Sequence, residues 1–125
     1  MRLLLDTHIF LWVVSDGSKL TAEVRRILDG ATAVYVSSAS IWEIAIKVQL
    51  GKLRADPDKM MNAIEASGFQ ELPVLSRHAA GVAKLPFHHS DLIDRLLVAQ
   101  AISEPMRLVT SDVQLTAYSE LIIKV

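Results

Sequence analysis

The stretch RLLLDTHIFLWVV, residues 2–14, decides the fold of this chain. Its leucine run, residues 3–5, ends at one carboxylate, Asp6, and a second apolar run, residues 9–14, begins shortly afterwards. This pattern predicts a buried strand, an acid at its carboxyl end, and a buried helix that leaves in the opposite direction. A lone buried carboxylate is costly unless it is paired, hydrogen-bonded or bound to a metal. The rest of the sequence must therefore supply partners for Asp6.

The composition is typical of one domain over residues 1–125 with a substantial apolar core, because 51% of the residues are hydrophobic and only 22% are charged. The net charge of −1 gives no global basic field, so a nucleic acid would need local Lys and Arg or bound cations. The lack of cysteine excludes disulfides and thiolate metal sites. Neither a signal peptide nor a membrane span is recognisable, and we expect a cytoplasmic protein without membrane contact.

Short apolar strands alternate with helices along the chain. The order predicts βαβ units, and hence an α/β fold with a mostly parallel sheet and helices on both faces. Pro73 places one strand near an edge of the sheet, because proline cannot donate to a ladder. The first helix is expected to end at residues 16–18. Later strands are expected near residues 33–36, 71–74, 106–110 and 121–123, and later helices near 22–29, 39–50, 57–67, 76–83, 91–103 and 113–118.

Four carboxylates fall where such a sheet collects its ligands, beyond the carboxyl ends of the strands. Asp6 and Asp112 follow the first and fourth strands, Glu43 lies on the helix after the second, and Asp94 lies in the first turn of a later helix. Carboxylates gathered in one cleft repel each other, and Mg²⁺ or Mn²⁺, which prefer oxygen ligands, would relieve that repulsion. Such a site suits phosphodiester hydrolysis, because a metal activates water and a second one can stabilise the leaving oxygen.

Each acid also has a purely structural explanation. Asp6 and Asp112 could each cap the helix that follows, and Glu43 could form a surface ion pair with Lys47. Ser40, Glu43 and Lys47 form a polar stripe on an otherwise apolar helix, and this stripe faces either solvent or a polar cleft. Spacing alone leaves open whether the acids meet.

Four sequence blocks carry a family resemblance. They are LDTH with LW at residues 5–8 and 11–12, SIWEIAIK with GKL at 40–47 and 51–53, HSDLIDRLLVAQA at 89–101, and LVTSD at 108–112. With these blocks the chain resembles a PIN domain, and more closely the VapC-type toxin ribonucleases of bacterial toxin–antitoxin pairs, over essentially all 125 residues. The resemblance implies a three-layer α/β/α domain, Mg²⁺- or Mn²⁺-dependent cleavage of RNA, inhibition by a cognate antitoxin, and homodimers.

The resemblance also assigns site residues. Thr7 and Thr110, beside the acids, are candidates for holding water or phosphate, and Asp91 is an additional acid. Apart from the resemblance, Lys47, Lys52, Arg54 and Arg95 are candidates for contacts with RNA phosphates, of which we retain Lys47 and Arg95; ordinary solvated charge is the alternative. The subgroup usually reads Asp-Pro-Phe-Asp-Arg where this chain has DLIDR, a change that keeps both carboxylates and the arginine. The family's catalytic, metal-binding acids fall on Asp6, Glu43, Asp94 and Asp112.

The histidine pair and the two tryptophans receive other expectations. The pair at residues 88–89 falls short of the three or four ligands of a transition-metal site, so we expect His89 beside substrate or a carboxylate. Trp12 and Trp42 lie in apolar runs and are expected to pack in the core or an interface rather than against bases. The apolar run at residues 9–14 predicts burial in the core, or against a second copy or an antitoxin segment.

The sequence therefore predicts a Mg²⁺-dependent endoribonuclease toxin. The alternative is a PIN-like module that binds RNA or protein without cutting, and the four intact acids argue against it. A receiver-like or phosphatase domain would need a lysine in a late loop, and the chain has none between Lys84 and Lys124.

Overall fold

The computed structural model describes residues 1–15 and 19–125, and its five strands form one fully parallel sheet in the order β3-β2-β1-β4-β5. The central strand β1 places Leu5 opposite Val36 on one side and Val109 on the other. The predicted α/β class is confirmed. The strands are β1 (Arg2–Leu5), β2 (Ala33–Ser37), β3 (Gln70–Leu72), β4 (Arg107–Thr110) and β5 (Ile122–Lys124).

Most helices begin where the sequence places a capping side chain. Thr21, Asp56 and Asp91 each accept a backbone N–H in the first turn of the helix that follows. The first helix is described as far as Val14, and its predicted stop at residues 16–18 lies outside the described residues. The helices are α1 (Thr7–Val14), α2 (Ala22–Asp29), α3 (Ser38–Gln49), α4 (Pro57–Ala66), α5 (Ser76–Gly81) and α6 (Leu92–Ser103), with 3₁₀ turns η1 (Val82–Lys84) and η2 (Val113–Ala117).

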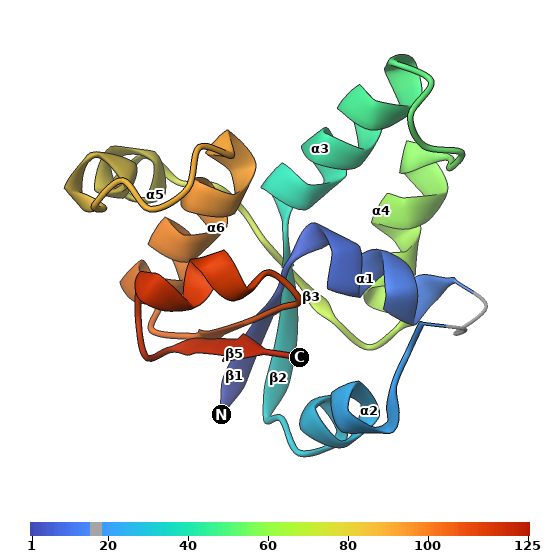
Figure 1. Cartoon of the computed structure of the whole chain (residues 1–125). Helices are drawn as coiled ribbons and strands as arrows, with labels where there is room; N and C mark the ends of the chain where they lie inside the picture. The colour runs from blue at the N-terminus through green and yellow to red at the C-terminus, as the bar shows by residue number, and fades with distance from the viewer. Residues whose placement is uncertain (16–18) are drawn as a thin grey trace.

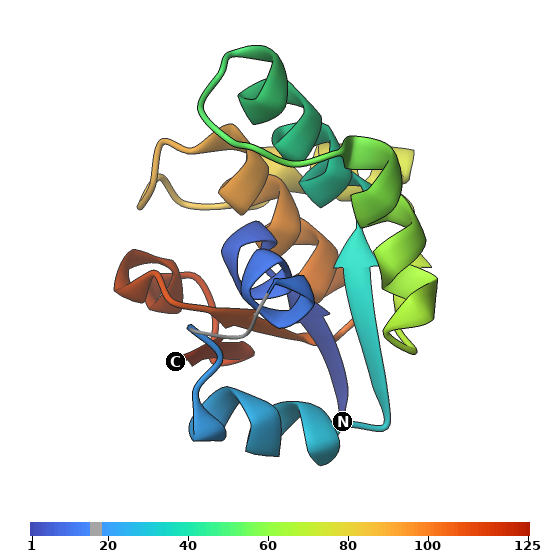
Figure 2. The same cartoon turned by 90° about the vertical axis from the view of Figure 1, so that its right-hand side faces the viewer.

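The period-two alternation of each strand divides the core into two apolar clusters, one on each face of the sheet. Leu3 and Leu5 of β1 belong to the cluster that includes side chains of α1, α2, α3 and α4, whereas Leu4 packs with α6 and η2. Figure 1 shows α5 and α6 to the left of the sheet and α1 and α4 to its right, and Figure 2 shows α2 near the N-terminus. The three-layer α/β/α arrangement is thus confirmed. No helix in the described part of the chain is long and apolar enough to cross a membrane.

Two apolar stretches are less covered than packing in the core alone would make them. Trp42 is 61% exposed because α3 turns this residue away from both apolar clusters, so the core alternative is wrong for it and packing in an interface stays a prediction. In α1, Ile9 and Phe10 are buried, but Leu11 and Trp12 are only half-buried. Residues 9–14 of this helix are therefore apolar on every side, but the side that carries Leu11 and Trp12 is only partly buried by the rest of the chain.

The sheet order fixes where a site can form. The chain builds β2 and β3 on one side of β1 and then crosses back to build β4 and β5 on the other. The carboxyl ends of β1 and β4 therefore adjoin at the point where the strand order reverses, which is the usual ligand position in open α/β sheets. In Figure 1 this edge lies toward the top, where α3 begins above the end of β2.

A cluster of polar side chains connects α5 to the C-terminal end of α6, away from that edge of the sheet. The ring of His78 is fully buried; its Nδ1 accepts the N–H of Leu75, so Nε2 carries the proton and donates to Glu104 at 2.6 Å. Arg77 contacts the same carboxylate oxygen at 2.6 Å. The hydrogen bond from His78 is the main cause that lowers the pKa of Glu104; burial opposes it and the charge of Arg77 assists it.

We expect Glu104→Gln to lower the free energy of unfolding by about 1–2 kcal/mol at neutral pH, because charge-assisted bonds to a carboxylate are lost. The folded pKa of Glu104 lies below its unfolded value, so this contribution is present above the unfolded pKa and disappears as the pH falls through the folded pKa. Urea unfolding at neutral and acidic pH measures the effect. The exposed Glu120, changed to Gln, is the control, and equal losses in the two variants would contradict the assignment.

Candidate active site

Asp6 directly follows β1, and both of its carboxylate oxygens are fixed by the protein. Oδ1 accepts the N–H of Ile9 at 2.8 Å, which caps α1, and Oδ2 accepts the hydroxyl of Thr110 at 2.5 Å. The residue is only 3% exposed. Burial raises the pKa of Asp6, although the hydrogen bonds from Thr110 and Ile9 act in the opposite direction. The helix-capping explanation is correct, and it coexists with a position at the strand edge.

Thr110 connects Asp6 to Asp112. The backbone N–H of Asp112 donates to Thr110 Oγ1 at 3.0 Å, which leaves the hydroxyl proton for Asp6. The carboxylate of Asp112 caps η2 by accepting the N–H of Gln114 at 2.9 Å. Burial raises the pKa of Asp112, but the hydrogen bonds from Gln114 and His89 outweigh it, and the net shift is downward. The ends of β1 and β4 are therefore joined through side chains.

His89 joins two of the predicted acids. Its Nε2 lies 2.8 Å from Asp112 Oδ2 and 3.5 Å from Asp94 Oδ2, and its Nδ1 accepts the N–H of Asp91 at 3.1 Å. The ligand-type atoms of His89, Asp94 and Asp112 all lie within 4.8 Å of one another. Because Nδ1 accepts the N–H of Asp91, the tautomer consistent with these contacts places the proton on Nε2, which then donates to Asp112. His89 thus organises the acids. Sequence reasoning anticipated its contact with a carboxylate but did not count it among the site residues.

Asp94 experiences the charge of the other acids. Its pKa is raised to about 7, chiefly by burial and then by repulsion from Asp91, Asp6 and Glu43, with His89 partly opposing. Asp94 is therefore within electrostatic range of acids from two other segments of the chain, Asp6 after β1 and Glu43 on α3. Asp91 is exposed and uses Oδ1 to accept the N–H groups of Ile93 and Asp94, so the structure shows it as the cap of α6.

Glu43 lies on a polar stripe of α3 that faces inward. Ser40 is fully buried and accepts the hydroxyl of Thr7 at 3.0 Å, and Glu43 is 7% exposed. Glu43 Oε2 pairs with Lys47 at 3.3 Å, whereas no donor among the described residues reaches the buried Oε1. A buried carboxylate oxygen without a partner is unfavourable. A cation at this position would satisfy it, so the donors present fit a hard metal ion.

Arg95 and Lys47, the two residues predicted to contact phosphate, both bind other groups of the protein in this structure. Arg95 is only 7% exposed and donates to the carbonyls of Pro86 and Val82 and to the hydroxyl of Tyr118. These bonds leave the guanidinium of Arg95 little freedom to reach a phosphate, and a phosphate contact by Arg95 stays an untested prediction. Lys47 forms the ion pair with Glu43 that was the structural alternative. The hydroxyls of Thr7 and Thr110 likewise donate to protein groups.

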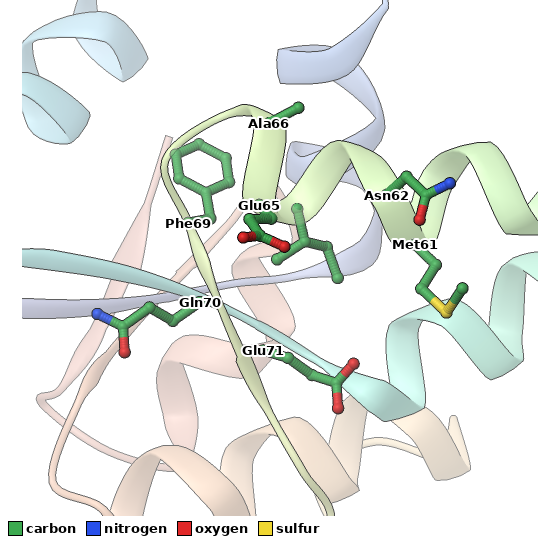
Figure 3. A pocket seen from close by; sticks show the side chains of 8 residues that line it. Met61, Asn62, Glu65, Ala66, Phe69, Gln70 and Glu71 are labelled. Atoms are coloured by element: carbon green, nitrogen blue, oxygen red, sulfur yellow. The ribbon is translucent and has the colours of Figure 1, made fainter.

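A separate open hollow lies between α4 and β3. Met61, Glu65, Phe69 and Glu71 are among the residues that line it (Figure 3). A smaller, mainly apolar hollow is lined by α1 together with residues 53–55 and Met60. Neither includes any of the four predicted acids, so the acidic cluster is distinct from both.

Known structures share this fold along nearly the whole chain. VapBC2 from Rickettsia felis, bound to a promoter DNA fragment, is 17% identical, covers 100% of this chain and 98% of its own, and has a TM-score of 0.71. A toxin–antitoxin complex from Klebsiella pneumoniae is 17% identical with a TM-score of 0.70 and coverages of 98% and 96%. FitAcB from Neisseria gonorrhoeae is 19% identical with a TM-score of 0.65 and coverages of 90% and 89%.

Sequence comparison assigns the family. No curated protein sequence matches this chain significantly. The model of the PIN domain family, however, matches residues 3–121, which is nearly the entire chain. The chain therefore belongs to the PIN domain family.

Proposed function

We propose that this PIN domain is a metal-dependent endoribonuclease toxin of the VapC type, with Asp6, Glu43, Asp94 and Asp112 as its catalytic metal ligands. The observation that carries the proposal is the gathering of acids: Asp94 and Asp112 meet at His89 with ligand-type atoms within 4.8 Å of one another, and the buried Oε1 of Glu43 has no donor among the described residues. The pKa of Asp94 agrees with this arrangement, since it is raised chiefly by burial and then by repulsion from Asp91, Asp6 and Glu43. Stability alone does not favour three neighbouring acids at one strand edge. A divalent cation would make the arrangement favourable.

The donor set suits Mg²⁺, with Mn²⁺ able to substitute. All four proposed ligands are carboxylates, and oxygen donors select hard cations over zinc or copper. Glu43 Oε1 supplies a buried oxygen without a protein partner. When bound, the cation would lower the pKa of a water and neutralise charge on the phosphodiester.

The chain's own residues would orient that chemistry. Thr110 and the N–H of Ile9 hold the Asp6 carboxylate in one orientation, and His89 holds Asp112 beside Asp94. Such supporting contacts fix ligand geometry in metal sites. If water attacks, rather than the RNA 2′-hydroxyl, the products carry a 3′-hydroxyl and a 5′-phosphate.

The proposed partner is a small antitoxin, with homodimers in the cytoplasm. Support comes from the shared fold with chains of the Rickettsia felis and Klebsiella pneumoniae complexes. The uncovered part of α1, including half-buried Leu11 and Trp12, agrees with a partner on this side.

We predict that the purified protein cuts a mixed cellular RNA pool into discrete fragments with Mn²⁺ or Mg²⁺ and not with chelator. Asp6→Asn should reduce the rate by about 100-fold or more, because a proposed ligand loses its charge. Asp56→Asn is a matched control, since Asp56 also caps a helix but lies outside the acidic cluster. Equal cleavage by wild type and Asp6→Asn, with metal binding shown separately, would instead favour the non-cutting module.

We predict that Asp94→Asn raises the free energy of unfolding in chelator by about 1–2 kcal/mol near pH 8 and has little effect near pH 4. The folded pKa of about 7 lies above the unfolded 3.8, so the folded state keeps a proton that the unfolded state has released. Stability therefore falls as the pH rises between these values, and the variant removes this loss. Denaturant unfolding across the pH range measures it.

The same variant should lose most of the stabilisation that Mg²⁺ gives the wild type. Asp58→Asn is the matched control, because Asp58 is also an acid in the first turn of a helix, α4. A Mg²⁺ response in Asp94→Asn equal to that of the wild type would show that Asp94 is not a ligand.

A further inference from the structure

Phe87 is an exposed aromatic side chain with a rigid support. It lies in the loop before α6 and is 78% exposed. The guanidinium carbon of Arg95 lies 4.9 Å from the centre of its ring, within the range of a cation–π interaction. Arg95 is itself buried and held by hydrogen bonds to Pro86, Val82 and Tyr118. The ring is thus backed by a cation that has little freedom to move.

The loop around Phe87 is fastened on both sides. On one side, the carbonyl of Pro86 accepts from Arg95 at 3.1 Å. On the other, the N–H of His88 donates to the hydroxyl of Tyr118 at 3.1 Å, and the two rings pack edge to face with centroids 5.0 Å apart. The position of Phe87 outside the core is therefore imposed by its neighbours.

Phe87 is also close to the acidic cluster. Two residues further on, His89 contacts both Asp94 and Asp112. Because consecutive Cα atoms are about 3.8 Å apart, the Cα atoms of Phe87 and His89 are separated by no more than roughly 7.6 Å. A strand of nucleic acid with a phosphate at the acids would bring a neighbouring base within reach of this ring.

We infer that Phe87 stacks against an unpaired base next to the cleaved phosphodiester, and that Arg95 is its positioning residue. The inference rests on the proposed nuclease function and adds to it a residue that contacts a base of the substrate. Aromatic side chains bind unpaired bases of any sequence through their faces, and a base inside a duplex is not accessible in this way. Single exposed apolar residues are common on protein surfaces. This one differs because a buried arginine lies against its ring and because it precedes, by two residues, the histidine that contacts Asp94 and Asp112.

The test is RNA binding measured apart from cleavage. A short single-stranded oligoribonucleotide containing 2-aminopurine, whose fluorescence reports stacking, is titrated with Asp6→Asn protein in Mg²⁺. Adding Phe87→Ala should weaken binding about tenfold and remove the fluorescence change. Phe87→Trp should retain both, and Phe87→Leu, which is apolar but cannot stack, should behave as Ala. A fully paired duplex of the same sequence should show no dependence on Phe87.

Met61→Ala is the control, since Met61 is 47% exposed and lies in the hollow between α4 and β3. In the active protein, Phe87→Ala should raise KM about tenfold with little change in kcat. Unchanged RNA binding in Phe87→Ala, or rescue by Leu as complete as by Trp, would overturn the inference and leave the nuclease proposal intact. Loss of antitoxin binding alone would overturn it in favour of a protein contact. Stacking without any metal-dependent cleavage would support it and count against the nuclease.

Discussion

The structure depends on the way the Asp6 carboxylate is held. One oxygen accepts the N–H of Ile9 in the first turn of α1, and the other accepts the hydroxyl of Thr110 at the end of β4. A single buried side chain thus ties a helix and two adjacent parallel strands together at the point where the strand order reverses. Thr110 extends the link to Asp112, whose carboxylate reaches His89. These contacts therefore orient Asp6 and Asp112 and at the same time connect elements of the fold.

The cost of this arrangement is electrostatic. The pKa of Asp94 is about 7, and the buried Oε1 of Glu43 lacks a hydrogen-bond donor among the described residues. Two apolar clusters on the faces of the sheet provide the stability that holds these groups together. Where a protein contains an arrangement that lowers its stability, such as clustered like charges, that arrangement is usually found at a functional site. The acidic edge of this sheet fits that pattern, and a cation would relieve it.

Much of the fold could be predicted from local signals, and much of the site could not. Some signals depend on only a few neighbouring residues and can be read from the sequence. They include the short apolar runs that become strands, the helix caps Thr21 and Asp56, and Pro73, which indicates the edge position of β3. The predicted helix over 76–83 divides into α5 and η1, and the one predicted over 113–118 is the 3₁₀ turn η2 (Val113–Ala117), since short helices depend on tertiary contacts. Sequence spacing could not show that Arg95 is buried beneath Phe87, because the three acceptors that hold it lie in η1, in the loop before α6 and just after η2.

The central claim is that Asp6, Glu43, Asp94 and Asp112 form one binding site for divalent cations. A crystal of the protein soaked in Mn²⁺ tests it most directly, because anomalous scattering locates manganese without assumptions about activity. The account predicts a manganese peak at the carboxyl ends of β1 and β4, within bonding distance of carboxylate oxygens from these acids. A well-ordered crystal with manganese only elsewhere, or with none at saturating Mn²⁺, would contradict it.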